Sequence, residues 1–172
     1  MNISIFGLGY VGCVGAACLA KLGHTVIGVD VNENKVRLIN EGKPTIIEDG
    51  IAELCAEAHG KGLMSATMDV REAVHATDVS FIVVGTPSSK EGHLNLNYIF
   101  TVARQIGEAL KDKTMVIDDL GFQNSILGFR NSNLKHIVAI RSTVLPGTNE
   151  KVGRIIEETS GLKRGTDFTI VS

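Results

Sequence analysis

A glycine pattern near the start of the chain constrains its fold more than any other feature. Residues 3–6 read Ile-Ser-Ile-Phe, a short apolar strand, and residues 7–12 follow directly as Gly-Leu-Gly-Tyr-Val-Gly. A helical pattern continues over residues 11–22, and a second apolar strand at residues 25–29 leads straight into Asp30. Strand, glycine turn, helix, strand and acid in this order predict a βαβ unit with two parallel strands.

Each part of this unit has a physical role in binding a dinucleotide. Gly7 lets the chain turn sharply off the strand, Gly9 lets a pyrophosphate approach the backbone, and Gly12 lets the helix pack closely on the sheet. The N-terminus of the helix offers N–H groups and a partial positive charge to phosphates. Asp30 is placed to accept hydrogen bonds from an adenosine ribose, and its charge repels a 2′-phosphate. The pattern therefore predicts an NAD site that discriminates against NADP; the alternative is a glycine turn without a ligand.

Length and composition restrict the classes of partner. The 172 residues fit one domain, and 44% hydrophobic with 21% charged residues is typical of a globular protein. A net charge of −2 argues against binding to nucleic acid or to an anionic membrane. No apolar run reaches the ~18 residues of a membrane span. Because the first residues form a strand and not a basic, apolar leader, we expect a cytoplasmic protein.

The cysteines and histidines show no catalytic or metal-binding pattern. Cys13, Cys18 and Cys55 form no CxxC pair and no zinc spacing, so we expect reduced packing residues and no metal site. Five positions separate the first two along one helix, which places them on different faces. Two histidines, His24 before one strand and His136 at the start of another, are expected to be turn or edge residues.

The rest of the chain alternates between helical and strand patterns. Helices are predicted after an Asn32 cap, over residues 51–59, from an Asp69 cap to 76, over 98–110 and from a Thr148 cap to 158, and strands over 63–67, 79–84, 136–140 and 166–171. The apolar run at 79–84 is typical of a strand buried on both faces of a parallel sheet. This alternation predicts an α/β fold, a Rossmann-like doubly wound parallel sheet with helices on both faces.

One segment departs from the alternation. Residues 114–117 look strand-like, and more than twenty residues separate the preceding helix from the strand at 136–140, where a few would suffice. We interpret residues 114–134 as an insertion, either a hairpin or a surface loop. Asp118 and Asp119 are expected to form a solvated turn there, because adjacent carboxylates converge poorly on a metal or as an acid/base pair.

Four segments resemble the NAD-binding domain of the UDP-glucose and GDP-mannose 6-dehydrogenases: residues 5–12, 28–31, 85–88 and 141–148. The sequences of the last two segments are more similar to those of the GDP-mannose branch of this family. Enzymes of this family oxidise the C6 alcohol of a nucleotide sugar to a carboxylate in two steps, with two NAD and a cysteine that carries a covalent thio-intermediate. The resemblance implies an NAD-dependent oxidoreductase, a nucleotide-sugar substrate for the full-length enzyme and the capacity to form homo-oligomers.

The resemblance also assigns cofactor contacts near the glycine pattern. It implies that Tyr10 and Val11 contact the pyrophosphate through their backbone, and that Asp30 holds the adenosine ribose with Lys35 beside it. Lys35 alone could equally be a solvated lysine on a helix. Glu48 matches a family glutamate, but the next residue is aspartate where the family has proline, so we assign it a structural role.

Two threonines follow the carboxyl ends of predicted strands, where ligands bind in open α/β sheets. Thr86 resembles a family cofactor contact, although it could simply cap a turn before Pro87. Thr143 resembles the family threonine near the nicotinamide. Its hydroxyl could position a water or a developing oxyanion as an auxiliary to catalysis, or it could be an ordinary residue at the end of a strand.

The family pattern continues beyond what these 172 residues contain. Family members carry an Asn-Pro-Glu segment, a helical dimerisation region with a catalytic lysine, and a loop with the nucleophilic cysteine, and none of the three cysteines here matches that nucleophile. We therefore expect a cofactor-binding domain that is inactive alone. The alternative is a non-catalytic module that binds NAD or a partner through apolar residues of the insertion, namely Leu120, Phe122, Ile126, Leu127 and Phe129. A 3-hydroxyacid-type dehydrogenase fits the run at 141–147 less well.

Overall fold

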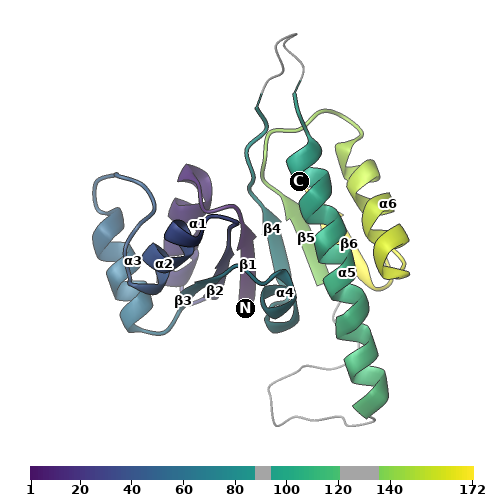
Figure 1. Ribbon diagram of the computed structural model, residues 1–172, viewed down its shortest axis with the longest axis horizontal. Helices are drawn as coiled ribbons and strands as arrows, with labels where there is room; N and C mark the ends of the chain where they lie inside the picture. The colour runs from purple at the N-terminus through teal and green to yellow at the C-terminus, as the bar shows by residue number, and fades with distance from the viewer. Residues whose placement is uncertain (88–93, 121–135) are drawn as a thin grey trace.

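A single parallel sheet organises the computed structural model, which describes residues 1–87, 94–120 and 136–172, with the backbone alone over 114–120 (Figure 1). Within these ranges the strand order is β3-β2-β1-β4-β5-β6. The strands are β1 (Asn2–Phe6), β2 (Thr25–Val29), β3 (Met64–Thr67), β4 (Val79–Ile82), β5 (His136–Ile140) and β6 (Phe168–Val171). The helices are α1 (Tyr10–Lys21), α2 (Glu33–Asn40), α3 (Ile51–Gly60), α4 (Val70–Ala76), α5 (Asn97–Leu120) and α6 (Thr148–Ser160). This order confirms the predicted Rossmann-like doubly wound sheet.

Helices cover both faces of the sheet. Helices α1, α2 and α3 lie on one face, and α4, α5 and α6 lie on the other (Figure 1). Because side chains alternate along a strand, Ile3 and Ile5 of β1 enter the core under α1 and α3, and Phe6 enters the core under α4 and α5. The order of the strands places the end of β1 between those of β2 and β4. β2 and β3 are added on one side of β1, and β4, β5 and β6 are added on the other.

The helix caps follow the sequence in two cases and depart from it in a third. The side chains of Asn32 and Asp69 accept hydrogen bonds from backbone N–H groups in the first turns of α2 and α4, as predicted. The prediction that Thr148 caps α6 is wrong. Gly147 occupies the cap position with φ 84°, and the Thr148 hydroxyl donates to the Leu145 carbonyl at 2.7 Å, which closes the preceding turn.

The segment expected to be strand-like is helical. Residues 114–117 continue α5, so that prediction is wrong, and Asp118 and Asp119 lie in the helix rather than in a turn. Extending a helix that is already packed costs less than starting a new element, which outweighs the β-branched residues of this stretch. Residues 121–134 of the proposed insertion lie outside the described residues, as does its apolar cluster beyond Leu120.

Two expectations about single residues have different outcomes. His136 is not an edge residue: β5 lies between β4 and β6, and His136 is only 6% exposed. The sequence pattern reveals that a strand starts there but not how many strands flank it. Cys13 is buried and Cys18 is exposed, which confirms that the two lie on different faces of α1. The expectation that the cysteines are packing residues holds for Cys13 and Cys55 and is wrong for Cys18, because residue 18 falls on the solvent-facing side of the helix.

Candidate functional site

The three glycines of the pattern, two in the turn after β1 and one in the first turn of α1, occupy distinct steric environments. Gly7 has φ 103°, and a Cβ there would lie 2.8 Å from the carbonyl oxygen of Val83. A Cβ on Gly12 would collide with the carbonyl oxygen of Gly7, because α1 begins directly against the turn. At Gly9, no heavy atom of the described residues beyond its chain neighbours lies within 4 Å of where a Cβ would stand. Two glycines therefore permit the chain to pack, and the third borders open space.

The N-terminus of α1 has the uncapped N–H groups that are typical of a helix end that binds an anion. Gly9 is the cap residue and provides no side-chain hydrogen bond, and the first turn contains no acidic residue. The first helical bond runs from the Cys13 N–H to the Gly9 carbonyl at 2.9 Å. The N–H groups before it have no acceptor within the helix, and they carry the positive end of its dipole. Tyr10 and Val11, the first two residues of α1, are 56% and 49% exposed.

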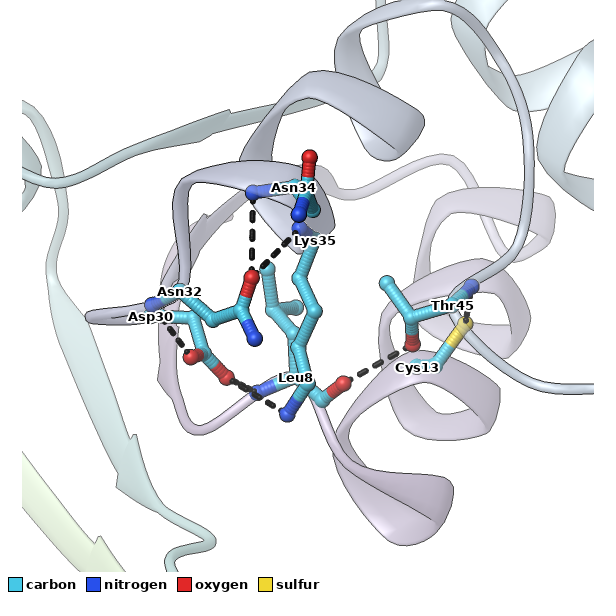
Figure 2. Close-up of polar contacts among 7 residues, drawn as sticks. All are labelled: Leu8, Cys13, Asp30, Asn32, Asn34, Lys35 and Thr45. Atoms are coloured by element: carbon cyan, nitrogen blue, oxygen red, sulfur yellow. Dashed lines mark hydrogen bonds and ion pairs between the residues drawn. The ribbon is translucent and has the colours of Figure 1, made fainter.

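Asp30 follows β2 and is tied to the glycine turn (Figure 2). Its Oδ2 accepts from the Leu8 N–H at 2.8 Å and from Lys35 Nζ at 3.2 Å, and its Oδ1 accepts from the Asn32 N–H at 2.9 Å. The side chain is 9% exposed. A carboxylate has about four acceptor positions, so one remains for an outside donor such as a ribose hydroxyl. The contact with Leu8 was not predicted from the sequence, because the two residues meet only after β1 and β2 pair.

The loops that follow β4 and β5 carry the two candidate threonines. Thr86 is half-buried and Thr143 is exposed. Ser142 links these loops, since its hydroxyl donates to the Val84 carbonyl at 2.7 Å. Sequence reasoning missed Ser142, whose one visible signal was its place directly before Thr143 in the family-like run. Because β1, β4 and β5 are parallel neighbours, both loops lie at the carboxyl ends of the strands, where the glycine turn also lies.

The connection between α2 and α3 lies against the same turn. The Thr45 hydroxyl donates to the Leu8 carbonyl at 2.8 Å, and the Tyr10 hydroxyl donates to Glu48 Oε2 at 2.8 Å. The hydrogen bond to Glu48, together with its negative charge, raises the pKa of Tyr10. The contact supports the structural role assigned to Glu48. Thr45 carried no signal in the sequence, because its partner is a backbone atom 37 positions away.

Other chemistry-bearing groups of the described residues lie apart from this turn. The thiols of Cys13 and Cys55 lie in the core, where the hydrogen bond that Cys55 donates to Cys13, together with burial, raises the pKa of Cys55. Among residues 1–87, 94–120 and 136–172, no cluster of three or more His, Cys, Asp or Glu side chains is arranged for a metal ion. Over the same ranges, no helix is both long and apolar enough to cross a membrane.

Comparison with known proteins supplies the family. Residues 1–120 match the model of the UDP-glucose/GDP-mannose dehydrogenase family, NAD binding domain. The chain is 48% identical over 171 residues to a GDP-mannose 6-dehydrogenase of Pseudomonas aeruginosa, covering 99% of this chain and 35% of that protein. It is 36% identical over 173 residues to a UDP-glucose 6-dehydrogenase of Rhizobium meliloti, covering 100% of this chain and 34% of the relative.

Solved structures agree with this assignment. A ternary complex of GDP-mannose dehydrogenase from Pseudomonas aeruginosa superposes with a TM-score of 0.84 at 47% identity, over 99% of this chain and 35% of that one. A UDP-glucose dehydrogenase from Pyrobaculum islandicum gives 0.81 at 36% identity, over 98% of this chain and 34% of its own. The chain thus spans about a third of the length of these relatives. On this evidence, the chain belongs to the UDP-glucose/GDP-mannose dehydrogenase family and corresponds to its NAD-binding domain.

Proposed function

We propose that these 172 residues are the cofactor-binding part of an NAD-dependent nucleotide-sugar 6-dehydrogenase. The observation that carries the proposal is the turn after β1, where the uncapped N-terminus of α1 borders open space at Gly9 and Asp30 lies alongside. The intact enzyme would oxidise the C6 alcohol of its sugar to a carboxylate. GDP-mannose is the favoured substrate, with UDP-glucose as the alternative, because identity is 48% to a relative of the first kind and 36% to one of the second.

The residues of the turn fit a dinucleotide. The backbone N–H groups of Tyr10 and Val11 would bind the pyrophosphate, and Gly9 would let it approach. The remaining acceptor position of Asp30 would take a ribose hydroxyl, with Lys35 beside it. When bound, NAD supplies the hydride acceptor for the oxidation. The charge of Asp30 disfavours a 2′-phosphate, and the Lys35 ammonium, 3.2 Å from its Oδ2, moderates that repulsion.

Thr86 and Thr143 complete the proposed site. Their hydroxyls can donate and accept, so either could orient the cofactor or a reacting oxygen, and we propose Thr143 as the auxiliary to catalysis. Ser142 would hold the two loops in a fixed relation through its bond to Val84.

We propose further that none of the three cysteines is the family nucleophile. Cys13 and Cys55 are buried in the core, and Cys18 lies about two helical turns from the end of α1 that would bind phosphate. A covalent route needs an accessible thiolate with a base to support it. Residues 1–172 should therefore bind NAD without turning over a sugar nucleotide. The three unlinked thiols suit a reducing compartment such as the cytoplasm.

Calorimetric titration of residues 1–172 with NAD and NADP tests the proposal. We expect NAD binding, weaker NADP binding, and at least a tenfold weaker affinity for NAD in Asp30→Ala, because a charge-assisted hydrogen bond is lost. Asp167→Ala is the matched control. Its carboxylate also accepts a hydrogen bond from a backbone N–H, that of Lys163, at 2.8 Å. Asp167 directly precedes β6, so it lies at the amino ends of the parallel strands, whereas the glycine turn lies at their carboxyl ends.

Two outcomes would count against the proposal. A folded natural chain that binds no NAD at millimolar concentration would overturn the cofactor site and leave the non-catalytic partner-binding module as the better account. Formation of NADH by residues 1–172 alone, with either GDP-mannose or UDP-glucose, would overturn the assignment of the nucleophile outside the three cysteines. Thermal melting of each variant shows whether a loss of affinity is a loss of folding.

A further inference from the structure

Leu8 is the residue of the glycine turn whose backbone is most constrained (Figure 2). Its N–H donates to Asp30 Oδ2 at 2.8 Å, and its carbonyl accepts from Thr45 Oγ1 at 2.8 Å. Its side chain is fully buried, and a Cβ on Gly28 of β2 would lie 2.6 Å from Leu8 Cδ2. The end of β2 and the connection between α2 and α3 therefore both hold this one residue of the turn.

The contact with Thr45 acts on a second residue through covalent geometry. The carbonyl of Leu8 and the N–H of Gly9 belong to one planar peptide group. A hydrogen bond that fixes the carbonyl oxygen therefore also fixes the direction of the Gly9 N–H. Gly9 is the position that borders open space at the N-terminus of α1.

Thr45 is itself anchored to the helix that follows the turn. Its backbone N–H donates to Cys13 Sγ at 3.4 Å, and Cys13 lies fully buried on α1. Thr45 thus joins the connection between α2 and α3 to both the turn and the helix. The neighbouring hydrogen bond from Tyr10 to Glu48 is exposed to solvent, so it contributes less to holding this connection against the turn.

We propose that Thr45 is a positioning residue for cofactor binding, whose hydroxyl orients the Leu8–Gly9 peptide at the pyrophosphate-binding turn. The inference rests on the proposed function and goes beyond it, because Thr45 need not touch the cofactor. The alternative is that this hydrogen bond stabilises the folded chain and has no bearing on affinity. The two accounts differ in what the hydroxyl does for a chain that is already folded.

Calorimetry with NAD, and with ADP-ribose as a second ligand carrying the pyrophosphate, separates them. Thr45→Val removes the donor and keeps the shape, and we expect three- to tenfold weaker binding of both ligands at a temperature where the variant is folded. Thr45→Ser restores the hydroxyl and should recover the affinity. Thr159→Val is the control, because its half-buried hydroxyl donates to the Ile155 carbonyl at 2.7 Å within α6, and it should leave affinity unchanged.

Three other results would overturn the positioning role of Thr45. Equal affinity in the natural chain and in Thr45→Val would overturn the positioning role and leave the proposed function intact. Failure of Thr45→Ser to recover would also overturn it, because shape and not the hydroxyl would then matter. Absence of NAD binding by the natural chain would overturn the proposed function and this inference with it. If Thr45→Val does not fold, the comparison of Thr45→Ser with Thr45→Ala carries the test.

Discussion

His136 makes the stability of this domain depend on pH. Its Nε2 lies 2.9 Å from the Ser80 hydroxyl, which in turn lies 2.8 Å from that of Ser4, inside the sheet. Burial is the main cause that lowers the pKa of His136 to about 3, and the charge of Lys113 lowers it further. Lys113 is held in place by hydrogen bonds to the carbonyls of Val74 and Thr77. A proton on His136 is therefore strongly disfavoured in the native state.

The size of the effect follows from the two pKa values. In the unfolded chain the pKa of His136 returns to 6.5, and in the native state it is about 3. Well above pH 6.5 the imidazole is neutral in both states, so its titration costs no stability. As the pH falls below 6.5, only the unfolded state takes up the proton, and stability is lost until the native pKa is reached. From pH 7.5 to pH 5.0 the loss is about 2 kcal/mol.

Urea unfolding followed by far-UV circular dichroism at pH 7.5 and pH 5.0 measures this difference. His136→Gln keeps an acceptor for Ser80 and removes the titration, so we expect it to lose about 2 kcal/mol less than the natural chain between the two pH values. The comparison is internal to each variant, so a general loss of stability in His136→Gln does not affect it. His59→Gln, which removes an exposed histidine, is the control. Equal losses in the natural chain and in His136→Gln would refute the reasoning.

Two further predictions concern the first turns of α1. Gly12→Ala should destabilise the domain by about 3 kcal/mol or more in urea unfolding, because its methyl group meets backbone that cannot move aside, whereas Gly15→Ala on the same helix has open space and should stabilise it by about 0.5–1 kcal/mol. Destabilisation by both, to the same degree, would contradict the steric argument. In a Tyr98→Phe background the chain keeps one tyrosine and no tryptophan, so ultraviolet titration reports Tyr10 alone, and Glu48→Gln should lower its pKa toward 10.0. An unchanged midpoint would exclude the link to Glu48.

Much of the fold was predictable because its signals are local. An apolar run such as residues 79–84 predicts a strand that is buried on both faces of the sheet. Asn32 and Asp69 predict helix starts, because their side chains accept hydrogen bonds from backbone N–H groups two and three residues later. The glycine pattern predicted the turn for the same reason, since the turn, the helix start and the acid are linked by chain geometry. Residues 114–117 misled because β-branched side chains favour a strand only when no established helix extends over them.

The contacts that shape the candidate site were not predictable in this way. Thr45, Ser142 and Asp30 each hold a backbone group between 22 and 58 positions away, and backbone atoms leave no trace in the sequence of either partner. The burial of His136 likewise depends on β6, which forms more than thirty residues later in the chain.

The sequence by itself determined the parallel α/β architecture, the glycine turn and the acid at the end of β2, because these depend on side-chain periodicity and on steric limits of the local backbone. Only the tertiary structure decided which peptide groups of the turn are held fixed, that Asp30 accepts a hydrogen bond from Leu8, and that a histidine is buried within the sheet, where its pKa is lowered. Those properties arise where strands and loops distant in the chain come into contact, and the energy of such contacts depends on burial and hydrogen-bond geometry that a linear pattern does not contain.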